Sequence, residues 1–159
     1  MSPREITRSS SQEINLNNTF LSAIDCQRQL IFAGLEDFSA NAALPNFHGG
    51  QYGGHQAEWR KAVVEFICSN IDCGLLEVVD YPGKPKSLDR NEVMRLLKNG
   101  DESRGLDAEL IWNCLYFSGT EKLKGVLEKL GILRWETING SENVTLMEYL
   151  KEAYQTPKL

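Results

Sequence analysis

Apolar residues recur at helical spacing along most of the chain, most clearly between Gln56 and Cys73. Counted from the first of them, they fall at offsets 0, 3, 4, 7, 8 and 12, and they are Trp59, Ala62, Val63, Phe66, Ile67 and Ile71. This spacing places them on one face of a helix. Gly74 follows at the position where a left-handed residue commonly ends a helix. We therefore predict a helix from about Gln56 to Cys73 that buries one face.

Capping signals and glycine stops indicate further helices. Asp89 with Glu92, and Thr145 with Glu148, have the spacing of a capping box, in which two residues three apart satisfy the first amide groups of a helix. Helices are predicted at about 18–38, 89–99, 106–117 and 120–130, and a last one is predicted from Thr145. Together with the helix after Gln56 this makes about six helices.

Strand signals are few. Leu75–Val79 is predicted to be a short strand, and Ile132–Ile138 leads into Asn139-Gly140, a dipeptide typical of a β-hairpin turn. The predicted fold class is mainly α: a single-domain helical bundle of about six helices with a small β-hairpin or two to three short strands. Residues 1–16 show little periodic apolar content, so we expect a flexible N-terminal arm there and one globular domain over 17–159.

Composition places the chain among ordinary globular proteins, with 42% hydrophobic and 25% charged residues. No apolar run approaches the roughly 20 residues needed to cross a bilayer, and the first residues lack the apolar core of a secretory signal. We expect a cytoplasmic protein with no membrane partner. The four cysteines match no familiar zinc spacing and are interpreted as structural thiols.

The charge of the chain is unevenly distributed. The net charge is −5, and residues 1–80 carry ten Asp and Glu against five Lys and Arg, whereas residues 81–159 carry twelve of each. An acidic half repels nucleic acid and attracts a basic protein surface. We therefore expect a protein partner and no nucleic-acid partner.

The segment His48-Gly-Gly-Gln-Tyr-Gly-Gly-His55 contains both histidines and four of the thirteen glycines. Two imidazoles at this spacing are weak candidates for a metal or acid–base site, with Glu58 as a possible third group. A small metal-dependent enzyme using His48 and His55 is therefore one alternative. The glycines do not match a phosphate-binding loop, no Gly-x-Ser-x-Gly occurs, and neither a catalytic residue, a cofactor nor a small-molecule substrate is indicated.

A second alternative comes from the order of elements. Helices at about 89–99, 107–117 and 120–130 followed by a hairpin have the succession of a winged helix, which would bind DNA through its third helix. That helix carries Lys122, Lys124 and Lys129 against Glu121 and Glu128, so it is barely basic. A duplex binder needs several phosphate contacts, which makes a DNA-binding regulator the less favoured function.

Carboxylates on the predicted helix after Gln56 favour protein binding. Three of them are seven residues apart and share one helical stripe, and two more follow the helix. The predicted partner-binding residues are Glu58, Glu65, Asp72, Glu77 and Asp80, with Tyr52 of the glycine-rich loop as an aromatic contact. A rigid array of carboxylates of this kind would occupy a cleft lined by Lys and Arg.

In general character over residues 17–155, this small acidic domain without a catalytic set resembles the immunity proteins of bacterial toxin–immunity pairs, including those of contact-dependent growth inhibition. The resemblance implies binding to a cognate toxin with a basic surface. Such a toxin is often a nuclease, and its active site would be blocked by complementary negative charge. No residue role is carried over, because no diagnostic motif supports the resemblance.

Overall fold

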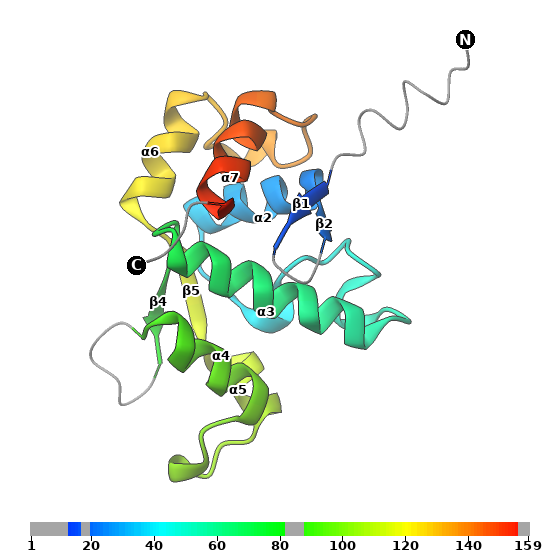
Figure 1. Cartoon of the computed structure of the whole chain (residues 1–159), viewed down its shortest axis with the longest axis vertical. Coiled ribbons are helices and arrows are strands. Elements are labelled where there is room, and N and C mark those ends of the chain that lie inside the picture. The colour runs from blue at the N-terminus through cyan, green and yellow to red at the C-terminus, as the bar shows by residue number, and fades with distance from the viewer. Residues whose placement is uncertain (1–12, 17–19, 82–87, 156–159) are drawn as a thin grey trace.

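The computed structural model describes residues 13–16, 20–81 and 88–155 (Figure 1). Its helices are α2 (Ala23–Leu35), α3 (Gln56–Asp72), α4 (Arg90–Asn99), α5 (Ala108–Cys114), α6 (Glu121–Lys129) and α7 (Val144–Gln155). Short 3₁₀ turns are η1 (Ala40–Ala42), η2 (Gly50–Tyr52), η3 (Glu102–Arg104) and η4 (Trp135–Thr137). The mainly α fold class with short strands is thereby confirmed.

Two small antiparallel sheets accompany the helices. β1 (Glu13–Asn15) pairs with β2 (Phe20–Ser22), with Ile14 opposite Leu21. The second sheet has the order β3 (Phe38–Ser39), β5 (Tyr116–Gly119), β4 (Leu76–Asp80). Phe117 of β5 is paired on one side with Phe38 and on the other with Val78, so it lies at the centre of this sheet.

Helix α3 crosses the middle of the molecule, with α2, α6 and α7 on one side and α4 and α5 on the other (Figure 1). Its apolar face supplies the fully buried Trp59 and Phe66, as the spacing predicts. Trp112 of α5 packs at 5.6 Å from Trp59, measured between ring centroids. One apolar cluster therefore runs through both groups of helices and fixes α3 from both sides.

The strongest local signals are confirmed. Asp89 accepts a hydrogen bond from the Glu92 amide (2.9 Å) while the Glu92 carboxylate accepts from the Asp89 amide (3.0 Å), which completes the predicted capping box of α4. Thr120 caps α6 by accepting from the Leu123 amide (3.2 Å). Gly74 follows α3 with a φ of 79°, a left-handed conformation that glycine adopts without strain.

The helix predicted over 106–117 is wrong in its second half. Helix α5 ends at Cys114, and Tyr116 begins the central strand β5. In that strand Phe117 is buried and Tyr116 is exposed, which is the alternation of a strand. The helix predicted over 18–38 is likewise shorter, because Phe20 belongs to β2 and Phe38 to β3.

The hairpin predicted at Asn139-Gly140 is also wrong, because residues 132–138 contain the turn η4 instead of a strand. The Thr137 hydroxyl donates to the carbonyls of Ile132 and Arg134, so these carbonyls are satisfied locally without a partner strand. The cap of α7 is Asn143, which accepts from the Leu146 amide (2.9 Å), and not the predicted Thr145.

The predicted arm over 1–16 extends too far. Residues 1–12 lie outside the described residues, but Ile14 and Leu16 are buried in the core next to α2 and α7. They are two apart, so both side chains lie on the same face of β1 and its extension. Among the described helices, none is long and apolar enough to cross a membrane.

Candidate functional site: a rigid loop and the groove beside it

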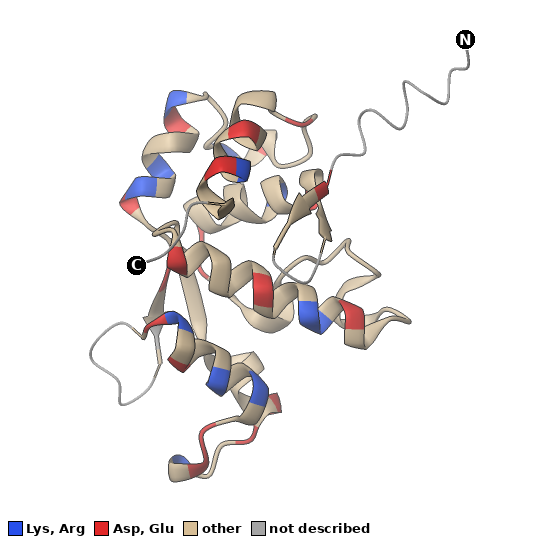
Figure 2. Cartoon of the chain, viewed as in Figure 1, with Lys and Arg blue, Asp and Glu red and all other residues tan. Residues whose placement is uncertain are grey.

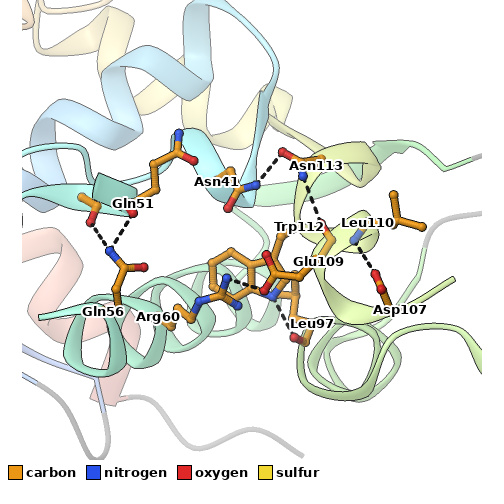
Figure 3. A network of polar contacts seen from close by, with 11 residues as sticks. Asn41, Gln51, Gln56, Arg60, Leu97, Asp107, Glu109, Leu110, Trp112 and Asn113 are labelled. Carbon is orange, nitrogen blue, oxygen red and sulfur yellow. Dashed lines mark hydrogen bonds and ion pairs between the residues drawn. The ribbon is translucent and has the colours of Figure 1, made fainter. Parts of the chain in front are cut away.

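The glycine-rich segment before α3 is a fixed turn rather than an open loop. The side-chain amide of Gln56, the first residue of α3, donates to the carbonyls of Gln51 (2.6 Å), Gly53 (3.1 Å) and Gly50 (3.3 Å), as Figure 3 shows in part. Backbone hydrogen bonds from Gly50 to Phe47 and from Gly53 to Gly50 close the same turn. One glutamine side chain thus ties three successive parts of the loop to the start of the helix.

Three of the four glycines in this segment are required by its geometry. Gly49 and Gly50 have φ values of 83° and 65°, which strain residues with a side chain. Gly53 has an ordinary backbone conformation, but a Cβ atom there would lie well under 3.0 Å from the His48 carbonyl oxygen. The chain therefore passes so close to itself at Gly53 that no side chain fits.

The base of the loop is anchored in the core. The buried Trp59 indole donates to the carbonyls of Ala43 (3.0 Å) and Leu44 (3.2 Å). The buried Gln29 carboxamide accepts from the Leu44 amide (2.8 Å). The Trp59 and Gln29 side chains thus fix the segment at Ala43 and Leu44 that precedes the loop, while Gln56 fixes the C-terminal end of the loop.

Tyr52 is displayed at the top of this turn. Its side chain is 90% exposed, more than any other large apolar or aromatic side chain in the described residues. Glu58 is also exposed and lies in the first turn of α3, six residues further along the chain. The structure therefore places two of the predicted partner-binding residues at one end of α3.

The two histidines approach one another but do not form a metal site. Their ring centroids are 5.2 Å apart, and His48 packs edge-on against Phe47 at 4.4 Å. Both side chains are exposed. Within the described part of the chain, no group of three or more His, Cys, Asp or Glu side chains is arranged to hold a metal ion. The pair thus contributes an exposed aromatic surface beside Tyr52.

The remaining predicted carboxylates are dispersed. Asp72 at the end of α3 forms an ion pair with Arg90, the first residue of α4, at 3.0 Å between Oδ2 and Nε. Glu65 is half-buried between the two helices, and Glu77 is exposed on β4. The side chain of Asp80 lies outside the described part of the structure. The stripe predicted from seven-residue spacing is therefore divided between the loop end and the contact with α4.

A groove of about 650 Å³ lies between α3 and α4 and is closed at one end by α5. Its lining residues are Arg60, Lys61, Val64, Glu65, Ser69, Arg90, Met94, Leu97, Lys98 and Trp112. Sequence reasoning missed this groove, because its walls come from three helices. Figure 2 shows a single basic segment on α3 with acidic segments on both sides of it, and several basic segments on α4.

Polar contacts fix the closed end of the groove, as Figure 3 shows. The Arg60 guanidinium lies 4.5 Å from the centre of the Trp112 ring and forms an ion pair with Glu109 at 2.7 Å. The Trp112 indole donates to the Leu97 carbonyl (2.7 Å). Arg60 therefore links α3 to α5, and Trp112 links α5 to α4, so the end wall is rigid.

The two fully buried cysteine thiols, Cys26 and Cys68, do not have the character of nucleophiles. Burial raises the pKa of Cys26 to about 12 and that of Cys68 to about 11, although the Tyr154 hydroxyl near Cys26 and Arg90 near Cys68 act in the opposite direction. A thiol with so high a pKa carries almost no thiolate at neutral pH. Both side chains fill the core, in agreement with their interpretation as structural thiols.

The winged-helix succession is not what the structure has. Strand β5 separates α5 from α6, and η4 stands where the hairpin would follow the third helix.

Comparisons of the chain with protein-family models, with curated proteins and with solved structures give no match.

Proposed function

We propose that this protein is a binding inhibitor. It contacts a protein partner with the glycine-rich turn of residues 48–55, here called the Tyr52 turn, and with the adjoining end of α3. The observation that carries the proposal is the 90% exposed Tyr52 on a turn whose base and end are both fixed by hydrogen bonds. Holding an exposed tyrosine in place adds nothing to the stability of the fold. It does increase the affinity for a partner if the tyrosine is an anchor of the interface.

Tyrosine is one of the residue types that dominate protein interfaces, and truncating such an anchor costs about 2 kcal/mol or more of binding free energy. Part of the cost of association is the ordering of loops and side chains at the interface. In this turn Gln56, Gly53 and the base at Leu44 have already fixed the backbone that carries the tyrosine. Binding therefore requires little further ordering.

Charge favours a basic partner at this end of α3. Glu58 is exposed, forms no ion pair with a described cation, and lies six residues after Tyr52 along the chain. An exposed carboxylate beside an aromatic anchor steers and orients a surface rich in Lys and Arg. In its most specific form, the partner is a bacterial toxin, such as a nuclease, whose basic active site the turn covers.

The test is a pull-down with the purified chain and two double variants, each followed by mass spectrometry and by elution with salt. Tyr52→Ala with Glu58→Lys removes the anchor and reverses the adjoining charge. Phe20→Ala with Glu148→Lys is the matched control, because Phe20 and Glu148 are exposed elsewhere in the molecule. Wild type and control should retain one basic protein in stoichiometric amount, and the first variant should lose it.

Co-expression then tests the specific form. If the retained protein is a toxin, cells that produce it should grow with the wild-type chain and with the control, and should fail to grow with Tyr52→Ala, Glu58→Lys. Retention of the partner by that double variant at wild-type level would refute the proposed contact. An acidic partner would refute the proposed charge complementarity.

A further inference from the structure

The groove between α3 and α4 has features of a second binding site that does not depend on the Tyr52 turn. Its apolar lining comes from Val64, Leu97 and Trp112, which are buried, and from the half-buried Met94. A volume of about 650 Å³ is within the range of ligand sites. Methionine adapts its shape to different apolar contacts, which suits a lining that receives side chains from outside.

The rim of the groove is basic, although the chain as a whole is acidic. Arg60, Lys61, Arg90 and Lys98 line it. Arg60 and Arg90 are engaged by Glu109 and Asp72, respectively. Lys61 and Lys98 are both exposed, and no carboxylate in residues 13–16, 20–81 or 88–155 forms an ion pair with either of them. Two ammonium groups that form no ion pair with a described carboxylate thus remain at the groove.

The position of these lysines follows from the direction of the helices. The last residue of α3, Asp72, meets the first residue of α4, Arg90, so the two helices run in opposite directions. Lys61 near the start of α3 and Lys98 near the end of α4 consequently fall at the same end of the groove, the end closed by Trp112. Their charges add there, beside the apolar ring of Trp112.

The middle of the groove contains an unsatisfied acceptor. Oε1 of Glu65 is buried and has no hydrogen-bond partner within the described part of the chain. Leaving a buried polar group unpaired costs about 1–3 kcal/mol, and more for a charged group. A bound molecule with an N–H donor would remove that cost once the Glu65 side chain turns toward the groove. A helical peptide offers free backbone N–H donors in its first turn, whereas a simple fatty acid has none.

We propose that the α3–α4 groove binds an acidic segment of a partner protein that carries apolar side chains. The apolar side chains lie on Val64, Met94 and Trp112, and acidic side chains of the segment meet Lys61 and Lys98. An N–H group of the segment donates to Glu65. A helix with apolar residues at i, i+3, i+4 and i+7 and acidic residues beside them has this chemistry.

The experiment measures binding of a labelled peptide by fluorescence anisotropy at low salt. The peptide has about twelve residues, with Leu at helical spacing and Glu on both flanks of the Leu stripe. A second peptide has Lys in place of every Glu. The acidic peptide should bind the wild-type chain, and its affinity should fall as salt is added, because the lysines at the rim are exposed. The basic peptide should not bind.

Matched variants locate the site. Lys61→Glu with Lys98→Glu should weaken binding of the acidic peptide by roughly tenfold, because two attractive contacts become repulsive. Lys129→Glu with Arg134→Glu changes the net charge equally, and Lys129 is in the last turn of α6 as Lys98 is in the last turn of α4, so this control should bind as wild type does. All four residues are exposed, so both variants should fold.

Three results would overturn the proposal: no binding of the acidic peptide, equal binding of the two peptides, or equal loss of affinity in the two double variants. Tighter binding of dodecanoate than of the peptide would also overturn it, because the occupant would then be a small anion. Tyr52→Ala alone, which changes no charge near the groove, should leave peptide binding unchanged, and this separates a failure here from a failure of the proposed function.

Discussion

The rigidity of the Tyr52 turn can be tested with two neighbouring glycines that differ in a single respect. Gly53 and Gly54 both lie outside the left-handed region of φ, so an alanine causes no backbone strain at either position. A Cβ at Gly54 has nothing within 4 Å. A Cβ at Gly53 would collide with the His48 carbonyl oxygen and with Cα of Gly49. The two substitutions therefore reduce the conformational freedom of the unfolded chain equally, but only Gly53→Ala introduces a steric clash in the folded chain.

The magnitudes follow from that difference. Gly54→Ala should leave the chain unchanged or make it more stable by about 0.4–1 kcal/mol, because alanine restricts the unfolded chain. Gly53→Ala has the same gain, but the turn must open by roughly 1 Å to restore a tolerated contact, and such overpacking costs about 1–3 kcal/mol. The net loss should be about 1–2 kcal/mol, which corresponds to a fall in Tm of roughly 2–8 °C for a domain of this size.

Thermal unfolding and the pull-down described above measure both consequences. Gly53→Ala should lower Tm and weaken partner binding, since the opened turn no longer displays Tyr52 in one position. Gly54→Ala should do neither. If Gly53→Ala were as stable as Gly54→Ala and bound the partner equally well, the turn would not be rigid in the sense argued here, and the case for a preformed anchor would fail.

Two further predictions concern the core. Gln27→Ala removes hydrogen bonds to the Ser141 carbonyl (2.9 Å) and from the Asn143 amide (2.8 Å), so we expect a loss of about 2 kcal/mol in urea unfolding and faster hydrogen exchange at the Asn143 amide. Burial raises the pKa of Cys26 from 9.0 to about 12, so the folded state holds this proton more tightly than the unfolded state does. The resulting stability is present below about pH 9 and is lost as the pH rises toward 12. The decline of the unfolding free energy between these pH values should be shallower in Cys26→Ala.

The elements that were predicted correctly depend on signals within a few residues. The capping box at Asp89 and the threonine cap at Thr120 are local hydrogen bonds, so the helices that they begin form where the sequence indicates. The apolar face of α3 is equally local, since its period is set by the helix itself. For these elements the sequence already contains the deciding interactions.

The failures occur where a distant segment decides. The stretch after Cys114 is apolar enough to continue as a helix, but β5 forms because Phe38 and Val78 pair with Phe117 from both sides. From the sequence, Gln27 and Gln29 look like ordinary polar positions of a helix. Both are buried, however, and their side chains form hydrogen bonds with the backbone of Ser141 and Leu44, respectively, which lie outside that helix. A single sequence gives no sign of such pairings, because neither partner is near the other along the chain.

The candidate site shows the same limit in its electrostatics. Seven-residue spacing correctly places Glu58, Glu65 and Asp72 along α3. The negative potential of Glu65 and Asp72 is reduced, however, by cations of α4 that lie beside them. A uniformly basic partner surface would be attracted at Glu58 and repelled at Lys61 and Lys98. A partner that presents basic groups to the Tyr52 turn and an acidic, apolar segment to the groove satisfies both regions. A like-charge contact opposes binding about as strongly as an opposite-charge contact favours it. A surface with a negative region at Glu58 and a positive region at Lys61 and Lys98 therefore discriminates between partners better than a uniformly acidic surface would.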